Sequence, residues 1–468
     1  MSNLFAALNA ASSALQAFQS ALDVTQNNVS NAQTPGYAKQ SPVLDALSFN
    51  LQAGLSGGVT AGSPQSSRNE YAESAVRQAV ARLGSSSQLA TSLDPIEQAF
   101  NVTGTGGIAN ALDALFQSFS AWSATPSDAS AQSAVLSAAS DVAAAFSQTA
   151  SQLTQARANV NTDLQSTVTS INQIAVQIQQ YNIARQQSSA PDAGLDAQLH
   201  ASLEQLSQYA GVQSLTNSDG TITVLMDGQV PLVTGATVHP LSLQYVNPSG
   251  VANPSAEPDA TILDDSGNDV TGKITDGQLG ALLSVKNTTL PRLAGGPNQT
   301  GDVNTLAKTV ADAVNSVLTA AGGNPLFTYD SSSAVDTAGT LTVASGFQPT
   351  DLVAADPGPP PVSNGTALKL ANLGSSTNAG LQGMTFDQFY GSSASWIGDQ
   401  LSQAQTSQTA QQQAVTQAQS LRQQLSGVSL DEEATRLISL QRSYQAASQM
   451  VTVIDSLTQT LINMIPAS

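Results

Sequence analysis

The sequence predicts a mainly α-helical fold with a small β insertion, and three patterns support this prediction. Heptad stripes of apolar residues occupy both ends of the chain, which predicts terminal helices that pair as a coiled coil. Long stretches inside them keep the helical period, which predicts a domain built as a bundle of long helices. In the middle of the chain the period changes to two between Asp-Gly pairs, which predicts a central antiparallel β domain.

Composition limits the classes of function. The 468 residues carry a net charge of −19 with only 14 lysines and arginines, so we expect no nucleic-acid partner. No apolar stretch approaches the length of a membrane span, so we expect no membrane insertion. The chain has no cysteine, which excludes disulfides and thiolate chemistry. Lys39 is the single basic residue among the first 67, so we expect no cleaved signal peptide.

The first predicted unit, residues 1–50, is an amphipathic helix followed by a tight turn. The helix covers residues 1–30 and ends in an amide-rich run whose side chains compete with helical hydrogen bonds. Its apolar stripe repeats at alternating spacings of three and four: Leu4, Leu8, Ala11, Leu15, Phe18, Leu22, Thr25 and Val29. The turn is formed by Thr34, Pro35, Gly36 and Tyr37, with proline and glycine placed for a type II turn.

A helical domain is predicted on both sides of a β insertion. Its first part, residues 51–211, holds predicted helices at 69–83, 94–100, 142–181 and 191–209. The second of these begins at Asp94, a capping residue that precedes a first-turn proline. The β insertion covers residues 212–285. The return part, residues 286–428, holds a helix at 305–321, an irregular segment at 322–380 and a Gln-rich helix at 386–425.

The last predicted unit, residues 429–468, is a helix that Ser429 and Glu432 open with a capping box. Its apolar stripe comprises Leu430, Leu437, Leu440, Tyr444, Ala447, Val451, Ile454, Leu461 and Ile465, and only Glu433 and Thr458 interrupt it. Taken alone, this helix could equally face the core of a globular bundle. We expect the two terminal stripes to form an assembly interface of Leu4, Leu8, Leu15, Phe18, Leu22, Leu437, Leu440, Tyr444, Val451, Ile454 and Leu461.

The sequence gives little support for chemistry, and we expect no catalytic residue, cofactor or metal. His200 and His239 lack metal-binding spacing, and each is more typical of an ordinary core or surface side chain. Residues 104–109 match a loose dinucleotide-binding pattern, but a predicted helix precedes them where a strand is required. Asp264, Asp265, Asn268 and Asp269 resemble a calcium loop, although Gly267 falls too early and a hairpin tip is the better interpretation.

Three segments resemble a known family. The block NNVSNAQTPGYAKQ at residues 27–40 resembles the N-terminal signature of the bacterial flagellar axial proteins, which are the rod, hook and hook-associated subunits. The helical segment that begins IEQAFNVTGTGGIANALDALF and the C-terminal SLDEEATRLISLQRSYQAA resemble the hook-associated members. The resemblance is strong at both ends and weak in the middle of the chain.

This resemblance implies a structural subunit that joins hook to filament and assembles through coiled-coil termini. It implies export by the flagellar type III apparatus, an extracellular location on the flagellum, and terminal helices that order on incorporation. The implied partners are other copies in a ring, the hook protein below, a second junction protein and the filament above, and an export chaperone at the C-terminal helix. Two alternatives stay open: another axial subunit, of the hook or distal rod, or an adhesin or hydrolase carried on the flagellum.

Overall fold

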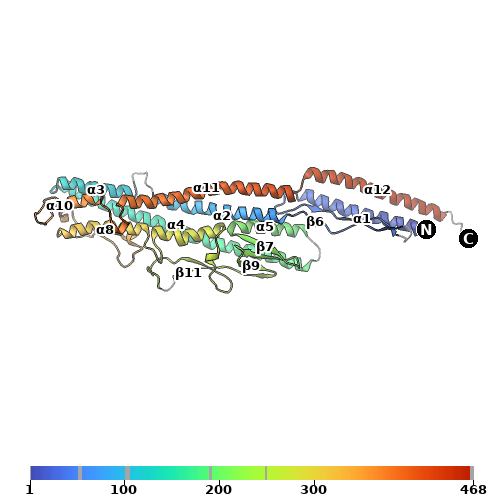
Figure 1. Cartoon of the computed structure of the whole chain (residues 1–468), viewed down its shortest axis with the longest axis horizontal. Helices are drawn as coiled ribbons and strands as arrows, with labels where there is room; N and C mark the ends of the chain where they lie inside the picture. The colour runs from blue at the N-terminus through green and yellow to red at the C-terminus, as the bar shows by residue number, and fades with distance from the viewer. Residues whose placement is uncertain (1, 51–54, 101–105, 189–191, 248–249, 464–468) are drawn as a thin grey trace.

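The computed structural model describes residues 2–50, 55–100, 106–188, 192–247 and 250–463. The molecule is an elongated rod, with both chain ends at the same tip (Figure 1). Long helices run along the rod and small antiparallel sheets lie on one side of it, so the predicted fold class is confirmed.

The helices carry most of the described chain. They are α1 (Ser2–Ser30), α2 (Glu70–Gln98), α3 (Ile108–Ala124), α4 (Ala129–Gln187), α5 (Ala193–Tyr209), α6 (Gly277–Ser284), α7 (Leu290–Ala294), α8 (Asp302–Ala320), α9 (Thr337–Thr340), α10 (Gly365–Leu373), α11 (Phe386–Ser426) and α12 (Leu430–Asn463). The three longest run along the rod: α4 spans 59 residues, α11 spans 41 and α12 spans 34.

The strands are short. They are β1 (Gln40–Ser41), β2 (Leu44–Ala46), β3 (Phe49–Asn50), β4 (Leu55–Ser56), β5 (Val59–Ala61), β6 (Gln65–Ser66), β7 (Val212–Thr216), β8 (Ile222–Met226), β9 (Val230–Thr234), β10 (Thr237–Val238), β11 (Ser242–Tyr245), β12 (Ala260–Leu263), β13 (Phe327–Thr328) and β14 (Thr342–Val343). The first six make three two-stranded ladders, β1–β6, β2–β5 and β3–β4, which return the chain along α1 towards the body.

The helix α2 corrects the sequence prediction, which placed separate helices at 69–83 and 94–100. Asn69 caps α2 by accepting a hydrogen bond of 3.0 Å from the Ala72 amide, and Pro95 lies inside the helix near its end. The small residues at 84–87 do not interrupt α2. Gly84 lies where α2 meets α5, since a Cβ on Gly84 would be 2.2 Å from the Gln208 carbonyl oxygen. Glycine here allows α2 and α5 to approach closely.

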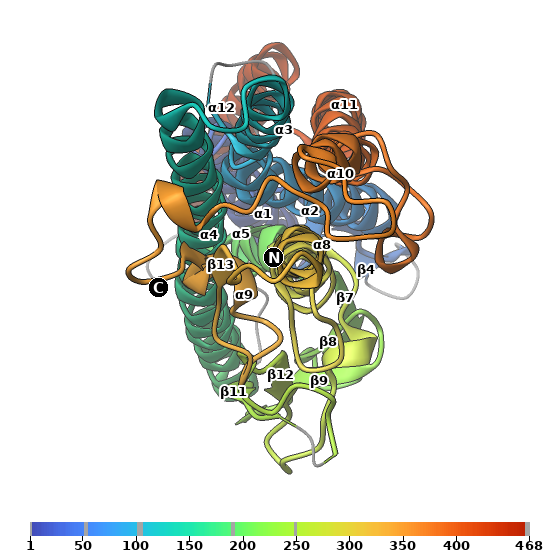
Figure 2. The same ribbon diagram turned by 90° about the vertical axis from the view of Figure 1, so that its left-hand side faces the viewer.

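The helical body has one continuous core. One apolar stripe along α4 is buried from Val142 to Ile178, with Tyr181 partly covered at its end. Large aromatic side chains from three helices are fully buried in this core: Phe119 and Trp122 of α3, Phe146 of α4 and Phe386 of α11. Viewed along the rod, α3, α4, α8, α10 and α11 surround this core, and β7, β8, β9, β11 and β12 lie together on one side (Figure 2).

The β unit is attached to α4 through its apolar face. The sheet has the order β10-β9-β8-β7 with all neighbours antiparallel, and β11 and β12 form a separate hairpin. The Asn182 amide of α4 donates to the carbonyl oxygens of Ile222 at 2.8 Å and Gly235 at 2.6 Å, and accepts from the Ile222 amide at 2.7 Å. Residues 277–284, placed in the β insertion by the sequence, form α6, which packs on α2 as part of the helical body.

The segment 322–380 contains short elements rather than long helices. It holds β13, β14, α9 and α10, which pack on α3, α4 and α8 near the tip opposite the termini (Figure 1). The suspected calcium loop after β12 is a turn, because the Asp264 carboxylate accepts from the amides of Ser266 at 3.0 Å and Asn268 at 2.8 Å. Local hydrogen bonds therefore explain this acidic cluster.

Candidate assembly interface

The helices α1 and α12 form an antiparallel pair that projects from the body. Asn28, near the end of α1, lies beside Glu433, near the start of α12, and both chain ends lie at the far tip (Figure 1). The residues of α12 that lose exposure follow one heptad stripe, which we call the seam: Glu433, Leu437, Leu440, Tyr444, Ala447, Val451, Ile454 and Thr458. The predicted stripe of α12 therefore faces α1, although Leu430, at the first position of the stripe, is 52% exposed.

The predicted interface residues differ in burial. Leu22 and Ile454 are 8% exposed, Tyr444 is 36% exposed, and the remaining ones are half-buried: Leu4, Leu8, Leu15, Phe18, Leu437, Leu440 and Val451. Leu461 belongs to α12, but its side chain lies outside the described part of the structure. The most buried positions of α1 include Ala11, Ala17 and Ala21, whose small side chains permit close approach of neighbouring elements.

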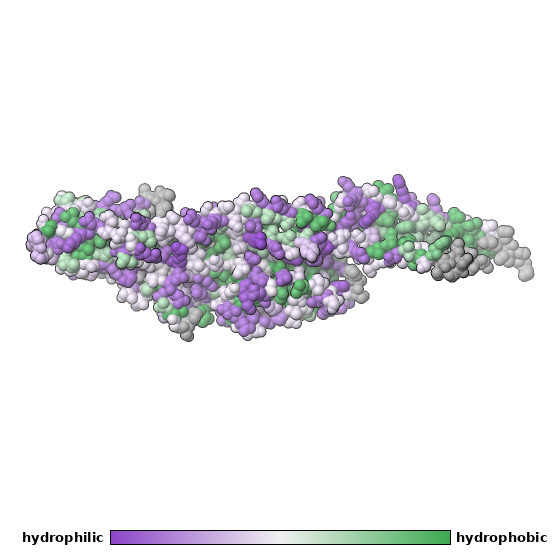
Figure 3. Space-filling view, in the orientation of Figure 1, coloured by the Kyte–Doolittle hydropathy of each residue, from purple (hydrophilic) through white to green (hydrophobic). Residues whose placement is uncertain are grey.

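A second apolar stripe on α12 remains exposed. We call it the outer stripe and define it as Met450, Val453 and Leu457, which share one side of the helix and are 50–59% exposed. Ile438 and Ile462 are also more than half exposed but lie on other sides of α12. Apolar surface gathers over the tip formed by α1 and α12, whereas the body is largely polar on the same face (Figure 3). A contiguous apolar face of this kind marks a surface that binds another protein.

The seam contains a fully buried polar cluster near its base. The Asn28 side chain is 0% exposed, and its amide nitrogen donates to the Gln40 carbonyl oxygen at 2.8 Å and to Glu433 Oε2 at 3.1 Å. Its amide oxygen accepts from the Gln40 backbone amide and from the Tyr37 hydroxyl, both at 2.9 Å. Burial, with the Glu433 charge as a smaller cause, raises the pKa of Tyr37 to about 12.

Lysine 39 provides the positive charge of this cluster. Lys39 Nζ lies 2.8 Å from the exposed Glu432 carboxylate and 3.5 Å from Glu433 Oε1. Only half of the predicted capping box therefore forms, because Glu432 binds Lys39 instead of the Ser429 amide. The backbone amide of Lys39 also donates to the Ser426 carbonyl oxygen at 2.9 Å, which joins the base of α1 to the end of α11.

The signature turn is held against the helical body. Tyr37 N–H donates to the Thr34 carbonyl oxygen at 3.1 Å, and Gly36 has φ +74°, as a type II turn requires at this position. Arg68 Nη2 donates to the Gly36 carbonyl oxygen at 2.7 Å, and the same guanidinium contacts Glu73 at 2.6 Å and Asp196 at 2.6 Å. Thr34 and Pro35 remain exposed.

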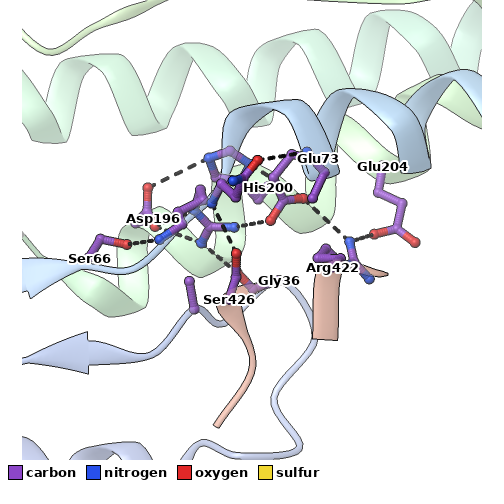
Figure 4. Close-up of polar contacts among 12 residues, drawn as sticks. Gly36, Ser66, Glu73, Asp196, His200, Glu204, Arg422 and Ser426 are labelled. Atoms are coloured by element: carbon purple, nitrogen blue, oxygen red, sulfur yellow. Dashed lines mark hydrogen bonds and ion pairs between the residues drawn. The ribbon is translucent and has the colours of Figure 1, made fainter. Parts of the chain in front are cut away.

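Further charges complete this joint between the terminal pair and the body (Figure 4). Arg422 of α11 lies 2.6 Å from Glu204 and 3.4 Å from Glu73. His200 is 6% exposed among these groups, and burial, together with the nearby arginines, lowers its pKa to about 2. His200 is therefore neutral, and the acidic and arginine side chains around it balance one another's charge.

The sequence prediction missed the polar residues of this region. Asn28 was assigned only to the end of a helix, Glu433 was treated as an interruption of a stripe, and Arg68 was not singled out. The available signal was the buried-side position of Glu433 in the heptad, since a charge at such a position needs a specific partner. Distance along the chain hid that partner, because Asn28 and Glu433 are 405 residues apart.

Among the described residues, few groups are candidates for metal or cofactor binding. Within the ranges that the structure describes, no three His, Asp or Glu side chains are arranged to hold a metal ion. His239 lies 2.7 Å from Asp265 near the β11–β12 hairpin, far along the chain from His200. The predicted dinucleotide-like pattern begins at Gly104, and residues 101–105 lie outside the described part. None of the described helices has the length and hydropathy to cross a bilayer.

Comparison with known proteins identifies the family of the chain. Residues 93–324 match the model described as the flagellar hook-associated protein FlgK helical domain. Residues 8–37 match the flagella basal body rod protein model, and residues 422–464 match the model of the flagellar basal body rod FlgEFG protein C-terminal region. Flagellar hook-associated protein 1 of Bacillus subtilis (strain 168) is 27% identical over 507 residues, with 99% of each chain covered. The chain belongs to the flagellar hook-associated protein 1 family.

Other members of the hook-associated protein 1 family align over nearly their whole length. The protein of Escherichia coli (strain K12) is 25% identical and that of Salmonella typhimurium is 24% identical, each with 98% of this chain covered and 99% of its own. The flagellar hook junction protein FlgK from Burkholderia pseudomallei shares the fold, with a TM-score of 0.61 at 19% identity. That match covers 74% of this chain and 99% of the other.

Family membership settles the class of function that the sequence left open. The chain is a structural subunit of the flagellar axis at the hook–filament junction, and the match to the hook-associated helical domain favours this over a hook or rod protein. The same domain model extends across the β unit, which agrees with the attachment of the sheet to α4.

Proposed function

We propose that this family member is incorporated into the flagellum through its α1–α12 pair, which packs against the pairs of neighbouring copies to form a ring. The outer stripe of α12 is the observation that supports the proposal. Its residues Met450, Val453 and Leu457 remain at least half exposed even though α1 covers the seam. A side chain of this size contributes about 2 kcal/mol when it is fully buried, so burying the exposed half of three contributes about 3 kcal/mol per copy.

The charge distribution of the pair favours the same role. Residues 1–38 contain one charged side chain, Asp23, so α1 can enter a packed layer with little desolvation of ions. The body carries most of the acidic residues of the chain and has a polar surface on the face shown in Figure 3. We therefore place the terminal pair in the axial layer and the body outside it.

The resemblance to the flagellar axial proteins implies the remaining partners. The ring contacts the hook protein below and a second junction protein and the filament above, and its role is mechanical rather than catalytic. Before assembly the outer stripe requires protection from water and from other copies, and an export chaperone that binds α12 provides it. The chain reaches its extracellular location through the flagellar export apparatus.

A pair of substitutions two residues apart tests the outer stripe. Val453→Asp places a carboxylate on the outer stripe, where the free protein leaves it in water and a packed ring would bury it. Cells with this variant should export the protein, lack filaments and release unassembled flagellin, while the purified variant melts at the parent temperature. Val451→Asp changes the half-buried seam instead, and it should also disturb the α1–α12 pair itself.

Thr452→Asp is the matched control, because Thr452 lies between these positions and is exposed on the polar side of α12. It adds the same charge to the same helix turn and should leave filament number unchanged. Normal filaments in cells with Val453→Asp would contradict the proposal. An equal loss of filaments with Thr452→Asp would show that added charge, and not burial of the outer stripe, is responsible.

A further inference from the structure

The base of the seam holds a carboxylate that has no contact with water. Glu433 is 0% exposed, and its partners are the Asn28 amide at 3.1 Å and Lys39 Nζ at 3.5 Å. We propose that Asn28 and Glu433 form a register lock, which selects one alignment of α1 against α12 out of several that the apolar seam would accept. This inference concerns pairing within the chain and is independent of where the protein sits in the flagellum.

The rest of the pair carries little information about register. Its most buried apolar positions are alanines, Ala11, Ala17 and Ala21 on α1 and Ala447 on α12. Alanine occurs at 7, 14 and 21, one heptad apart, so a slip of seven residues brings similar side chains opposite one another. Packing along this line of alanines, which also carries Asn28, therefore discriminates weakly between alignments, and a polar group on the same line can supply the register.

Asn28 and Glu433 supply this discrimination because the aligned state pairs Glu433 with the Asn28 amide and with Lys39, and a slipped state separates Glu433 from Asn28. In the observed alignment all four hydrogen-bonding positions of the Asn28 side chain are occupied. A slip of one heptad moves the helices by about 10 Å, which leaves Glu433 without the Asn28 amide inside an apolar seam. An unpaired buried charge is strongly unfavourable, whereas a well-packed apolar pair at the same position is often equally stable. The pair therefore contributes specificity rather than net stability.

The lock also sets the position of the returning chain. The Asn28 side chain donates to the carbonyl oxygen of Gln40 and accepts from its backbone N–H, as a neighbouring strand would. Its amide oxygen also accepts a hydrogen bond from the Tyr37 hydroxyl. Gln40 pairs with Ser66 in the β1–β6 ladder, which leads directly to Arg68 and α2. Alignment of α1 with α12 is thereby connected to the joint with the body.

Cysteine crosslinking measures register directly, because the parent chain has no cysteine. Counting two heptads from Asn28 and from Glu433 in this antiparallel pair places Ala14 opposite Ala447. Three full-length variants carry Ala447→Cys together with Ala7→Cys, Ala14→Cys or Ala21→Cys. A disulfide needs Cα atoms within about 7 Å, so only the Ala14 pair should close without a slip. We expect its initial rate of intramolecular disulfide formation to exceed the other two by at least about tenfold, the factor for a charged hydrogen bond.

Removing the lock should abolish this preference. In the background Asn28→Leu with Glu433→Leu, which keeps the seam apolar, the three rates should fall within about twofold of one another. Glu433→Gln keeps an acceptor for the Asn28 amide and should retain the preference for Ala14. The control background Asn27→Ala with Glu432→Ala removes the exposed neighbours of the same residue types and should also retain it.

Three outcomes would overturn the inference. The first is an unchanged preference for Ala14 in the background with both leucines. The second is equal rates for the three pairs in the parent, which would mean that the free chain has no fixed register. The third is loss of all three crosslinks with both leucines, together with reduced helix content, which would make the pair a requirement for folding instead of alignment.

Discussion

Replacing Gly36 with alanine tests how tightly the signature turn is seated on the body. An added Cβ would lie 2.2 Å from the Ala197 carbonyl oxygen and 2.9 Å from the Ala201 amide nitrogen. Both atoms belong to the backbone of α5, so neither can move without displacing the helix. The residue also has φ +74°, which costs alanine about 1 kcal/mol. With about 1–3 kcal/mol for the clash, the turn should lose about 3 kcal/mol of docking free energy.

Native-state hydrogen exchange is the suitable assay, because it reports local opening. A loss of about 3 kcal/mol raises the opening equilibrium about a hundredfold. The increase should appear at the Tyr37 amide, which donates to Thr34, and at the amides of α5 around Ala201. Gly383→Ala is the matched control: Gly383 has φ +78° and no atom within 4 Å of an added Cβ, so it carries only the backbone strain.

The comparison of the two glycines decides the question. Gly383→Ala should reduce stability locally by about 1 kcal/mol and leave exchange at Tyr37 unchanged. If Gly36→Ala shows the same exchange at Tyr37 as the parent, the close approach of the turn to α5 is not maintained in solution. If both variants accelerate exchange at Tyr37 equally, the effect arises from general destabilisation and the reasoning from the clash fails.

Two further predictions concern the body. The pKa of His200 is about 2 in the folded protein and about 6.5 in the unfolded chain. Between these pH values the unfolded chain binds one more proton than the folded protein, so the free energy of unfolding falls as the pH drops below 6.5. Between pH 7 and 5, the parent should therefore lose about 2 kcal/mol more of its free energy of unfolding than His200→Gln, as measured by thermal melting. Equal losses in the two proteins would contradict this. Asn182→Ala leaves backbone groups of Ile222 and Gly235 without their hydrogen-bond partner. It should lower the free energy of unfolding, measured by denaturant titration, by about 2–3 kcal/mol. A change below about 0.5 kcal/mol would show that water replaces the Asn182 amide.

Periodicity made much of this fold predictable. The heptad stripe of α12 predicted the side that faces α1, because a helix must cover an apolar stripe and the spacing of that stripe is local information. The long α4 and the change to two-residue alternation at β8 were predictable for the same reason. Boundaries were harder, since Gly84 and Pro95 usually interrupt helices but are accommodated in α2 by close packing with α5 and by a position near the helix end.

The polar contacts of the candidate interface could not be derived in this way. Glu433 has the wrong chemistry for its heptad position, and only the fold shows that Asn28 and Lys39 meet it there. The joint around Arg68 likewise joins the signature turn, α2 and α5, which are separate in the chain. Such contacts depend on three-dimensional proximity, and no periodic pattern encodes which distant residues become neighbours.

The hydrogen bond between Lys39 and Ser426 has a consequence for how the terminal pair closes. In an unfolded chain, Asn28 and Glu433 would have to meet across 405 residues of intervening loop. Once the body has folded, the bond of 2.9 Å between Lys39 and Ser426 leaves only about eighteen residues between them, eleven on one side and seven on the other. The shorter loop lowers the entropic cost of closure by about 3 kcal/mol. Pairing should therefore begin at the base and proceed towards the tip, as a zipper does, so that the chain ends are the last parts to close and the first to open.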